Sequence, residues 1–192
     1  MCSVLVGAGH IVAAVSSDAE RLASVDATST HVCDLTNFTA TTQLAAHVGA
    51  DHGTIDGLVH LVGGWRGGHE PADWDWLEPR ILTTLRNATL AFHDELTASD
   101  AGRLVTVGSI AAAKPTWGGA NYTVLKSAGD AWVAAVASGW RKGGTAAAVT
   151  FEVQSLGGDG TPVETLAANI LPLWESSATE VNGTRIDLTP KK

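Results

Sequence analysis

Three residues near the middle of the chain have the types and spacing needed for proton transfer to an oxygen atom: Ser109, Tyr122 and Lys126. Tyr122 and Lys126 are four positions apart, so on a helix they share a face, one turn from each other. An ammonium there lowers the pKa of the phenol, whose ordinary value of about 10 is too high for efficient proton transfer at neutral pH. The pattern therefore predicts an acid–base centre in which Ser109 hydrogen-bonds a substrate carbonyl or alkoxide.

The elements around these residues decide whether they can meet. "GRLVTVGSI" predicts a strand that ends at Ser109, and a helix is expected over residues 121–139. Further strands are expected in "HIVAAV", "THVCDLTN", "IDGLVHLVGG", "GGTAAAVTFEV" and "NGTRIDLT", and further helices in "SSDAERLA", "FTATTQLAAHVGADHG", residues 77–96 and "PVETLAANILPLWES". This alternation predicts an α/β fold, a Rossmann-like doubly wound parallel sheet in a single domain over residues 1–192. Ligands of such sheets bind beyond the carboxyl ends of the strands, where Ser109 is expected.

The composition narrows the classes of partner. The chain has 192 residues, 45% hydrophobic and 17% charged, which suits one packed core. A net charge of −8 with only 12 Lys and Arg argues against nucleic acid, because phosphate binding needs a basic face. Cys2 and Cys33 give no disulfide framework, and no apolar run reaches the roughly 20 residues of a membrane span. We expect a cytoplasmic protein that acts on a small molecule, without a nucleic-acid or membrane partner.

The segment that holds the acid–base centre resembles the active-site segment of short-chain dehydrogenases/reductases. In "LVTVGSIAAAKPTWGGANYTVLKSAGDAWVAAVASGW" the strand, the serine, the interval to the tyrosine and the YxxxK pair stand where that family has them. The resemblance implies NAD or NADP as cofactor, Tyr122 as proton donor or acceptor that also contacts the cofactor, and Lys126 as the residue that binds the cofactor ribose. It also implies that Asn87, in "ILTTLRNATLAF", supports a water relay to the lysine.

The resemblance extends to segments that contact the cofactor. "VCDLTN" resembles the strand end whose aspartate contacts adenine, which implies Asp34 and Leu35. "HLVG" stands where the family has NNAG, which implies Val62 and Gly63 and leaves both family asparagines replaced. "VGGWRGG" resembles the dihydropteridine-reductase branch, although that branch is not typified by a serine at position 109.

The beginning of the chain departs from the family, which opens with a strand and a glycine-rich TGxxxGxG turn that binds the cofactor diphosphate. One interpretation takes residues 4–6 as that strand, "GAG" as the turn and residues 11–25 as its helix. The other takes "LVGAGH" as the end of the first helix and "IVAAV" as the second strand, and fits better because only one strand–helix unit fits before Asp34. It implies that the first βα unit is missing and that cofactor binding is weak. Ser16 then stands where an acidic residue binds the adenine ribose, so NAD and NADP both stay open.

Seven tryptophans and seven histidines raise the question of an aromatic or metal site. Most tryptophans are expected in the core or in a subunit interface, whereas Trp65 and Trp117 follow strands and are expected to complete an open pocket. His47 and His52 lie five apart across a glycine, and His60 lies in an apolar strand. This is not the spacing of metal ligands, so we expect structural or surface roles and no metal.

Two functions are compatible with these features. The first is an NAD(P)-dependent oxidoreductase that transfers a hydride between a nicotinamide cofactor and a carbonyl, alcohol or imine-like small molecule. The second is a relative without catalytic activity that acts as a binding or subunit-interaction module, which the absent glycine turn favours. Under either, we expect a homo-oligomer, a dimer or tetramer, because the helix of Tyr122 carries small residues that permit close packing: Ala128, Ala131, Ala134 and Ala135.

Overall fold

Six strands form two separate parallel sheets in the computed structural model, which describes residues 1–190. The strands are β1 (Ala13–Ser16), β2 (Ser29–Val32), β3 (Gly57–His60), β4 (Arg103–Ser109), β5 (Ala147–Val153) and β6 (Arg185–Asp187). β1 pairs with β2, with Ala13 opposite Ser29. The other four strands lie in the order β3-β4-β5-β6, with Gly57 opposite Arg103 and Arg103 opposite Ala147. Within residues 1–190, β1 and β3 therefore each have one hydrogen-bonded neighbour.

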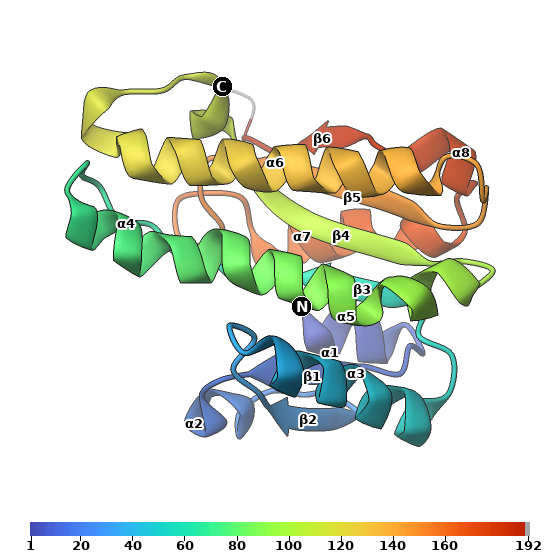
Figure 1. The fold of residues 1–192 in the computed structure, drawn as a ribbon. Coiled ribbons are helices and arrows are strands. Elements are labelled where there is room, and N and C mark those ends of the chain that lie inside the picture. The colour runs from blue at the N-terminus through green and yellow to red at the C-terminus, as the bar shows by residue number, and fades with distance from the viewer. Residues whose placement is uncertain (191–192) are drawn as a thin grey trace.

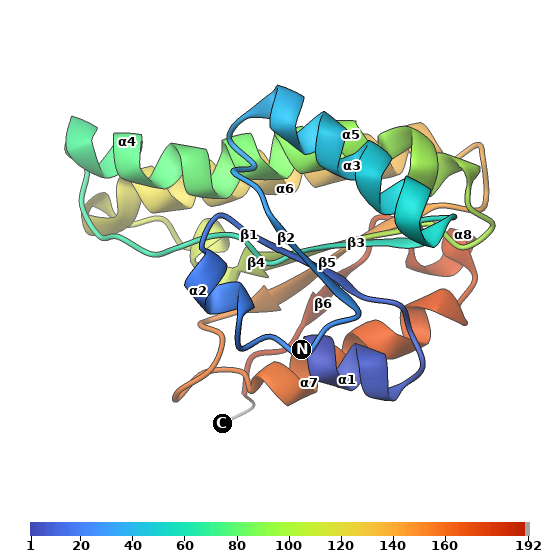
Figure 2. The same cartoon turned by 90° about the horizontal axis from the view of Figure 1, so that it is seen from below.

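Helices cover the larger sheet on both faces, which gives three layers (Figure 1). Figure 2 shows α3, α4, α5 and α6 on one side of the strands, and α1, α7 and α8 on the other. The α-helices are α1 (Cys2–Gly7), α2 (Ala19–Leu22), α3 (Phe38–His52), α4 (Pro71–Glu78), α5 (Thr84–Ala98), α6 (Ala120–Trp140), α7 (Val163–Ile170) and α8 (Ala178–Val181). A π-helical segment η1 (Pro79–Thr83) and the 3₁₀ segments η2 (Ile110–Ala113), η3 (Trp117–Gly119) and η4 (Leu171–Trp174) complete them. The α/β class, the parallel pairing and the Rossmann-like arrangement are as the sequence predicts.

Strand β4 shows why this sequence has two covered faces. Leu104 and Val105 are both fully buried, yet they belong to different clusters of the core. Leu104 packs with side chains of α3, α5 and α6, whereas Val105 packs with side chains of α1 and α7. Because successive side chains of a strand point to opposite faces, a strand covered on both sides needs apolar side chains on each face, as at Leu104 and Val105.

The first residues of the chain form a helix, not a strand. α1 covers residues 4–6, and Leu5 is buried in the same core cluster as Leu166 of α7. The interpretation that places the first strand there is wrong, and the one that places a helix end before "IVAAV" is confirmed, since β1 begins at Ala13. None of the helices within residues 1–190 combines the length and apolar character needed to cross a membrane.

The loop expected before residue 77 contains a helix as well. α4 begins at Pro71, and the side chains of Glu70 and Asp73 form a capping box at its start. Both are start signals, because proline needs no N–H partner in the first turn and a capping box satisfies two free N–H groups. η1 then joins α4 to α5 at Pro79, where the missing N–H interrupts regular α-helical bonding. The chain is thus helical from Pro71 to Ala98.

Candidate active site

Ser109 is the last residue of β4 and lies at the carboxyl end of the larger sheet. Its side chain is 3% exposed, and its hydroxyl oxygen accepts a hydrogen bond of 3.3 Å from the backbone N–H of Ala111. That bond caps η2 and leaves the hydroxyl hydrogen available for another acceptor. Ser109 therefore lies where the sequence places it, at the edge where ligands of parallel sheets bind.

Tyr122 and Lys126 lie one turn apart on α6, as their spacing predicts. The Lys126 ammonium is 6.0 Å from the centre of the Tyr122 ring. It donates a hydrogen bond of 2.9 Å to the backbone carbonyl of Val107 in β4. This is the one hydrogen bond that the ammonium makes within the part of the chain that the structure describes, so two of its N–H groups remain for other acceptors.

Burial dominates the acid–base properties of this pair. Burial raises the pKa of the Tyr122 phenol. Hydrogen bonding with Ser109 lowers this pKa, and the negative charge of Asp130 raises it. Burial lowers the pKa of the Lys126 ammonium, whereas the negative charge of Asp130 raises that pKa. The expected lowering of the Tyr122 pKa is wrong for this structure, because burial of the phenol disfavours the phenolate and raises the pKa above its ordinary value.

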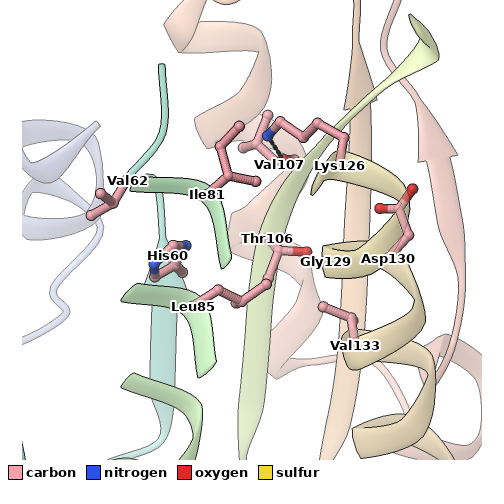
Figure 3. A pocket seen from close by; sticks show the side chains of 10 residues that line it. All are labelled: His60, Val62, Ile81, Leu85, Thr106, Val107, Lys126, Gly129, Asp130 and Val133. Atoms are coloured by element: carbon pink, nitrogen blue, oxygen red, sulfur yellow. Dashed lines mark hydrogen bonds between the residues drawn. The ribbon is translucent and has the colours of Figure 1, made fainter. Parts of the chain in front are cut away.

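A small pocket lies beside the lysine (Figure 3). Its polar side chains are His60 from β3, Thr106 from β4, and Lys126 and Asp130 from α6. Two of them are already engaged: Thr106 contacts the Thr150 hydroxyl at 3.1 Å, and Asp130 accepts a bond of 2.9 Å from Arg185. In the same pocket, Nε2 of His60 has no hydrogen-bond partner among residues 1–190, and the Lys126 ammonium keeps two N–H groups.

The residues implied for cofactor binding fall into two groups. Val62 lines the pocket beside Lys126, and Gly63 follows it at a position where an added Cβ would meet nothing within 4 Å. Asp34 and Leu35 instead follow β2 of the smaller sheet. Asp34 is exposed, and its carboxylate accepts two hydrogen bonds from Thr36, of 2.9 and 2.8 Å, which hold its pKa below the ordinary value. Leu35 packs its side chain partly against the core.

The side chain of Asn87 joins α5 to the segment that follows β2. It is 3% exposed on α5, and its amide nitrogen donates to the carbonyls of Leu35 at 2.9 Å and Thr36 at 3.0 Å. Its amide oxygen accepts a bond of 3.3 Å from Arg86. Within residues 1–190 its side chain makes no hydrogen bond to Lys126. The structure therefore gives the Asn87 side chain a bridging position between α5 and the end of β2, and its part in a water relay to the lysine stays a prediction.

Two exposed tryptophans mark the loops at this edge of the sheet. Trp65 is 73% exposed and Trp117 is 74% exposed. Their loops meet, because the Gly68 N–H donates a bond of 2.7 Å to the Gly118 carbonyl. The His69 ring lies 4.4 Å from the Trp117 ring. Flat aromatic surface is therefore available beside the acid–base centre.

His60 ends β3 at the ligand edge and lines the same pocket as Lys126. The sequence predicts a structural or surface role for this histidine, and its place beside the lysine is not part of that prediction. The signal was present in "GLVH", where one polar side chain closes an apolar strand at the carboxyl end of the sheet.

The comparisons with known proteins agree with this geometry. The family model of the short chain dehydrogenases matches residues 1–164. Because this is most of the chain, the protein belongs to the short-chain dehydrogenase family and is an oxidoreductase of that family. No curated protein sequence matches the chain.

Solved structures share the fold at low sequence identity. A metagenomic short-chain oxidoreductase in complex with NADP is 24% identical, with a TM-score of 0.80 over 100% of this chain and 91% of that one. An NADPH-bound short-chain oxidoreductase from Pseudomonas aeruginosa with an atypical catalytic centre is 18% identical, with a TM-score of 0.85 over 96% and 88%. Ligand-free aldohexose dehydrogenase from Thermoplasma acidophilum is 15% identical, with a TM-score of 0.83 over 97% and 86%.

Proposed function

We propose that the protein transfers a hydride between a nicotinamide cofactor and a carbonyl, alcohol or imine-like small molecule through Ser109, Tyr122 and Lys126. The observation that carries the proposal is the meeting of these three residues at the carboxyl end of β4, with Ser109 buried and in reach of the Tyr122 phenol. Substrates of this class have an oxygen or nitrogen that must gain or lose a proton as carbon gains or loses the hydride. A phenol and a hydroxyl on one side of the substrate meet that need.

Each of the three residues has a distinct part in this proposal. Ser109 donates its hydroxyl hydrogen to the substrate oxygen when substrate is bound, and orients that oxygen. Tyr122 supplies the proton in the reductive direction and receives it in the oxidative one. Lys126 directs its unused N–H groups toward the cofactor ribose.

The residues at the two ends of the site fit a nicotinamide dinucleotide. Open space at Gly63 leaves room for a flat ring beside Lys126, and the exposed Asp34 carboxylate offers acceptors for an adenine amine. The NADP and NADPH in two of the similar structures support the same assignment. When bound, the cofactor supplies the hydride, and the protein supplies position and proton transfer.

The diphosphate between those ends has a poorer site. A diphosphate binds well at a helix N-terminus, where free N–H groups point outward. Gly7 and Gly9 lie at the other end of α1, where carbonyl groups point outward and the helix dipole is negative. We therefore propose weak cofactor binding, with NAD and NADP both open.

Fluorescence titration of the purified chain with NADH and NADPH tests the proposal, because energy transfer from the tryptophans reports a bound nicotinamide. We expect binding in the upper micromolar to millimolar range. Turnover is then measured with NADPH and phenanthrenequinone as the carbonyl probe. The Tyr122→Phe variant should bind NADPH like the wild type and lose roughly 10²–10⁴-fold in kcat, as removal of a general acid does.

Absence of binding at millimolar concentration would overturn the enzymatic proposal. It would favour the alternative function, a binding or subunit-interaction module without catalysis, which the reversed polarity at the end of α1 supports. Equal turnover in the wild type and Tyr122→Phe would refute the role of the phenol.

A homo-oligomer is part of the same proposal. Ala131, Ala134 and Ala135 are exposed on α6, together with Val124, which is 54% exposed. Small and apolar side chains on one long helix permit close packing against a second copy. Sedimentation equilibrium at several protein concentrations would distinguish a monomer from the dimer or tetramer that we expect.

A further inference from the structure

The ring of His60 is an unsatisfied hydrogen-bonding group in the interior. His60 is 6% exposed, and its Nε2 atom is buried without a partner. Within residues 1–190, the indole nitrogen of Trp132 is the other side-chain atom in this condition. A buried polar group without a partner costs about 1–3 kcal/mol, so its retention in an apolar strand needs an explanation.

The protonation state of the ring fixes what Nε2 needs. Burial, with a smaller contribution from the Lys126 charge, lowers the pKa of His60 to about 4, and hydrogen bonding with the backbone carbonyl of His60 opposes this lowering. The ring is therefore neutral at physiological pH. Its one hydrogen lies on the nitrogen that faces the backbone carbonyl, and Nε2 holds a lone pair that requires a donor.

Lys126, which lines the same pocket, has N–H donors that lack an acceptor within the described part of the chain. Lys126 uses one N–H on the Val107 carbonyl and keeps two donors, and it lines the same pocket as His60 (Figure 3). The pocket has ≈ 20 Å³ of space for the centres of water molecules. One buried water needs roughly 10–15 Å³ and two to four polar partners.

We propose that one water molecule in this pocket accepts a hydrogen bond from the Lys126 ammonium and donates one to Nε2 of His60, which makes His60 a positioning residue for Lys126. The water gives Nε2 of His60 the donor that it lacks and gives the Lys126 ammonium an acceptor for one of its unused N–H groups. It holds the ammonium in one orientation below the cofactor ribose. The inference rests on the proposed function for its catalytic consequence, but not for the water bridge itself.

The other groups around the pocket leave this task to His60. The titratable groups that face it are Lys126 and Asp130, and Asp130 is engaged by Arg185. η1 and α5 contribute the apolar side chains of Ile81 and Leu85. Asn87, which the family resemblance assigns to a relay, uses its amide nitrogen on two carbonyls beyond β2.

Three variants test the role of His60 in turnover. His60→Leu removes the acceptor at similar volume, His60→Asn restores a side-chain acceptor, and His47→Leu on the exposed side of α3 is the matched control. With NADPH and phenanthrenequinone, we expect His60→Leu to lose roughly 10-fold in kcat and to raise the KM for NADPH, because Lys126, which binds the cofactor ribose, is no longer held in place. His60→Asn should recover most of that loss, and His47→Leu should match the wild type.

A second readout does not depend on turnover. Nitrogen NMR of labelled histidine and lysine should find Nε2 of His60 unprotonated and hydrogen-bonded, and the pKa of Lys126 lower in His60→Leu than in the wild type. A hydrogen on Nε2, or the same Lys126 titration in both proteins, would overturn the water bridge. Equal kcat in His60→Leu and His47→Leu would overturn the positioning role.

The two proposals fail in distinguishable ways. If no form of the protein reduces phenanthrenequinone or binds NADPH, the proposed function fails, and the NMR result still decides the bridge. If His60→Leu does not fold, His60→Asn and the nitrogen spectrum of the wild type decide it.

Discussion

A cation lies at each end of strand β4, and the two cations differ in how many hydrogen bonds they make to the protein. At the amino end, Arg103 is 2% exposed, and its guanidinium donates four hydrogen bonds of 2.8 Å to the carbonyls of Leu173, Gly102, Thr145 and Ser176. At the carboxyl end, Lys126 is buried beside the strand with one bond, to Val107. Within residues 1–190, Arg103 makes four hydrogen bonds, whereas Lys126 makes one and keeps two N–H groups unused.

The difference separates a stabilising position from a functional one. Arg103 joins β4 to η4 and to the segment before β5, so its contacts hold together parts of the chain that are distant in sequence. Lys126, His60 and Ser109 instead keep free hydrogen-bonding groups at the edge where ligands bind. Unsatisfied groups cost stability, and their concentration at one end of the sheet is typical of an active site.

Replacement of the arginine should give the largest effect. Arg103→Met keeps an apolar chain of similar length but leaves four buried carbonyls without that donor. We expect a loss of about 4 kcal/mol in the free energy of unfolding, measured by urea denaturation. Lys126→Met is the matched variant at the other end of the strand, and we expect a change within about 1 kcal/mol, because the lost bond is offset by removal of a poorly solvated charge. Equal losses in the two variants would contradict the distinction between the two ends.

The buried histidine should make the functional end sensitive to acid. The pKa of His60 is lowered from 6.5 to about 4, mainly by burial, so between these values the unfolded chain binds a proton that the folded chain does not. The contribution of the neutral His60 ring to the free energy of unfolding is therefore complete above pH 6.5 and is lost as the pH falls toward 4. A pKa shift of this size corresponds to a change of about 3 kcal/mol in the free energy of unfolding.

Urea denaturation of the wild type and His60→Leu at a series of pH values measures this contribution. We expect the wild type to lose more stability than the variant between pH 6.5 and 4. Parallel curves would mean that His60 titrates alike in the folded and unfolded chains.

The sequence predicts the part of the site that lies in one contiguous segment. β4, Ser109 and α6 could be placed from a continuous apolar strand and a helical Tyr–Lys spacing, since both signals are local. The parallel α/β class follows from the same alternation of strands and helices. α4 was missed although its proline and capping box are local too, because the glycines and tryptophans before it suggest a loop.

The partners of His60, Asn87 and Arg103 could not be predicted in the same way. Asn87 bonds to carbonyls 51 and 52 positions away, and Arg103 to carbonyls up to 73 positions away. Whether a polar side chain is satisfied depends on such distant groups and on burial, neither of which a local pattern contains. The same holds for the direction of the Tyr122 pKa, which burial sets against the expectation from the Tyr–Lys spacing.

The smallest expected effect is a change in the Tyr122 pKa when Ser109 is replaced, and it tests whether Ser109 acts on the phenol at the carboxyl end of β4. Burial raises the pKa of Tyr122 above its ordinary value of 10.0, and hydrogen bonding with Ser109 lowers it. Ser109→Ala removes the lowering contribution, so we expect the phenol to titrate at a higher pH in the variant. Tyr122 is the chain's only tyrosine, so tyrosinate absorbance follows this one group. An unchanged or lower midpoint would mean that Ser109 does not stabilise the phenolate, and its part would then be confined to the substrate oxygen.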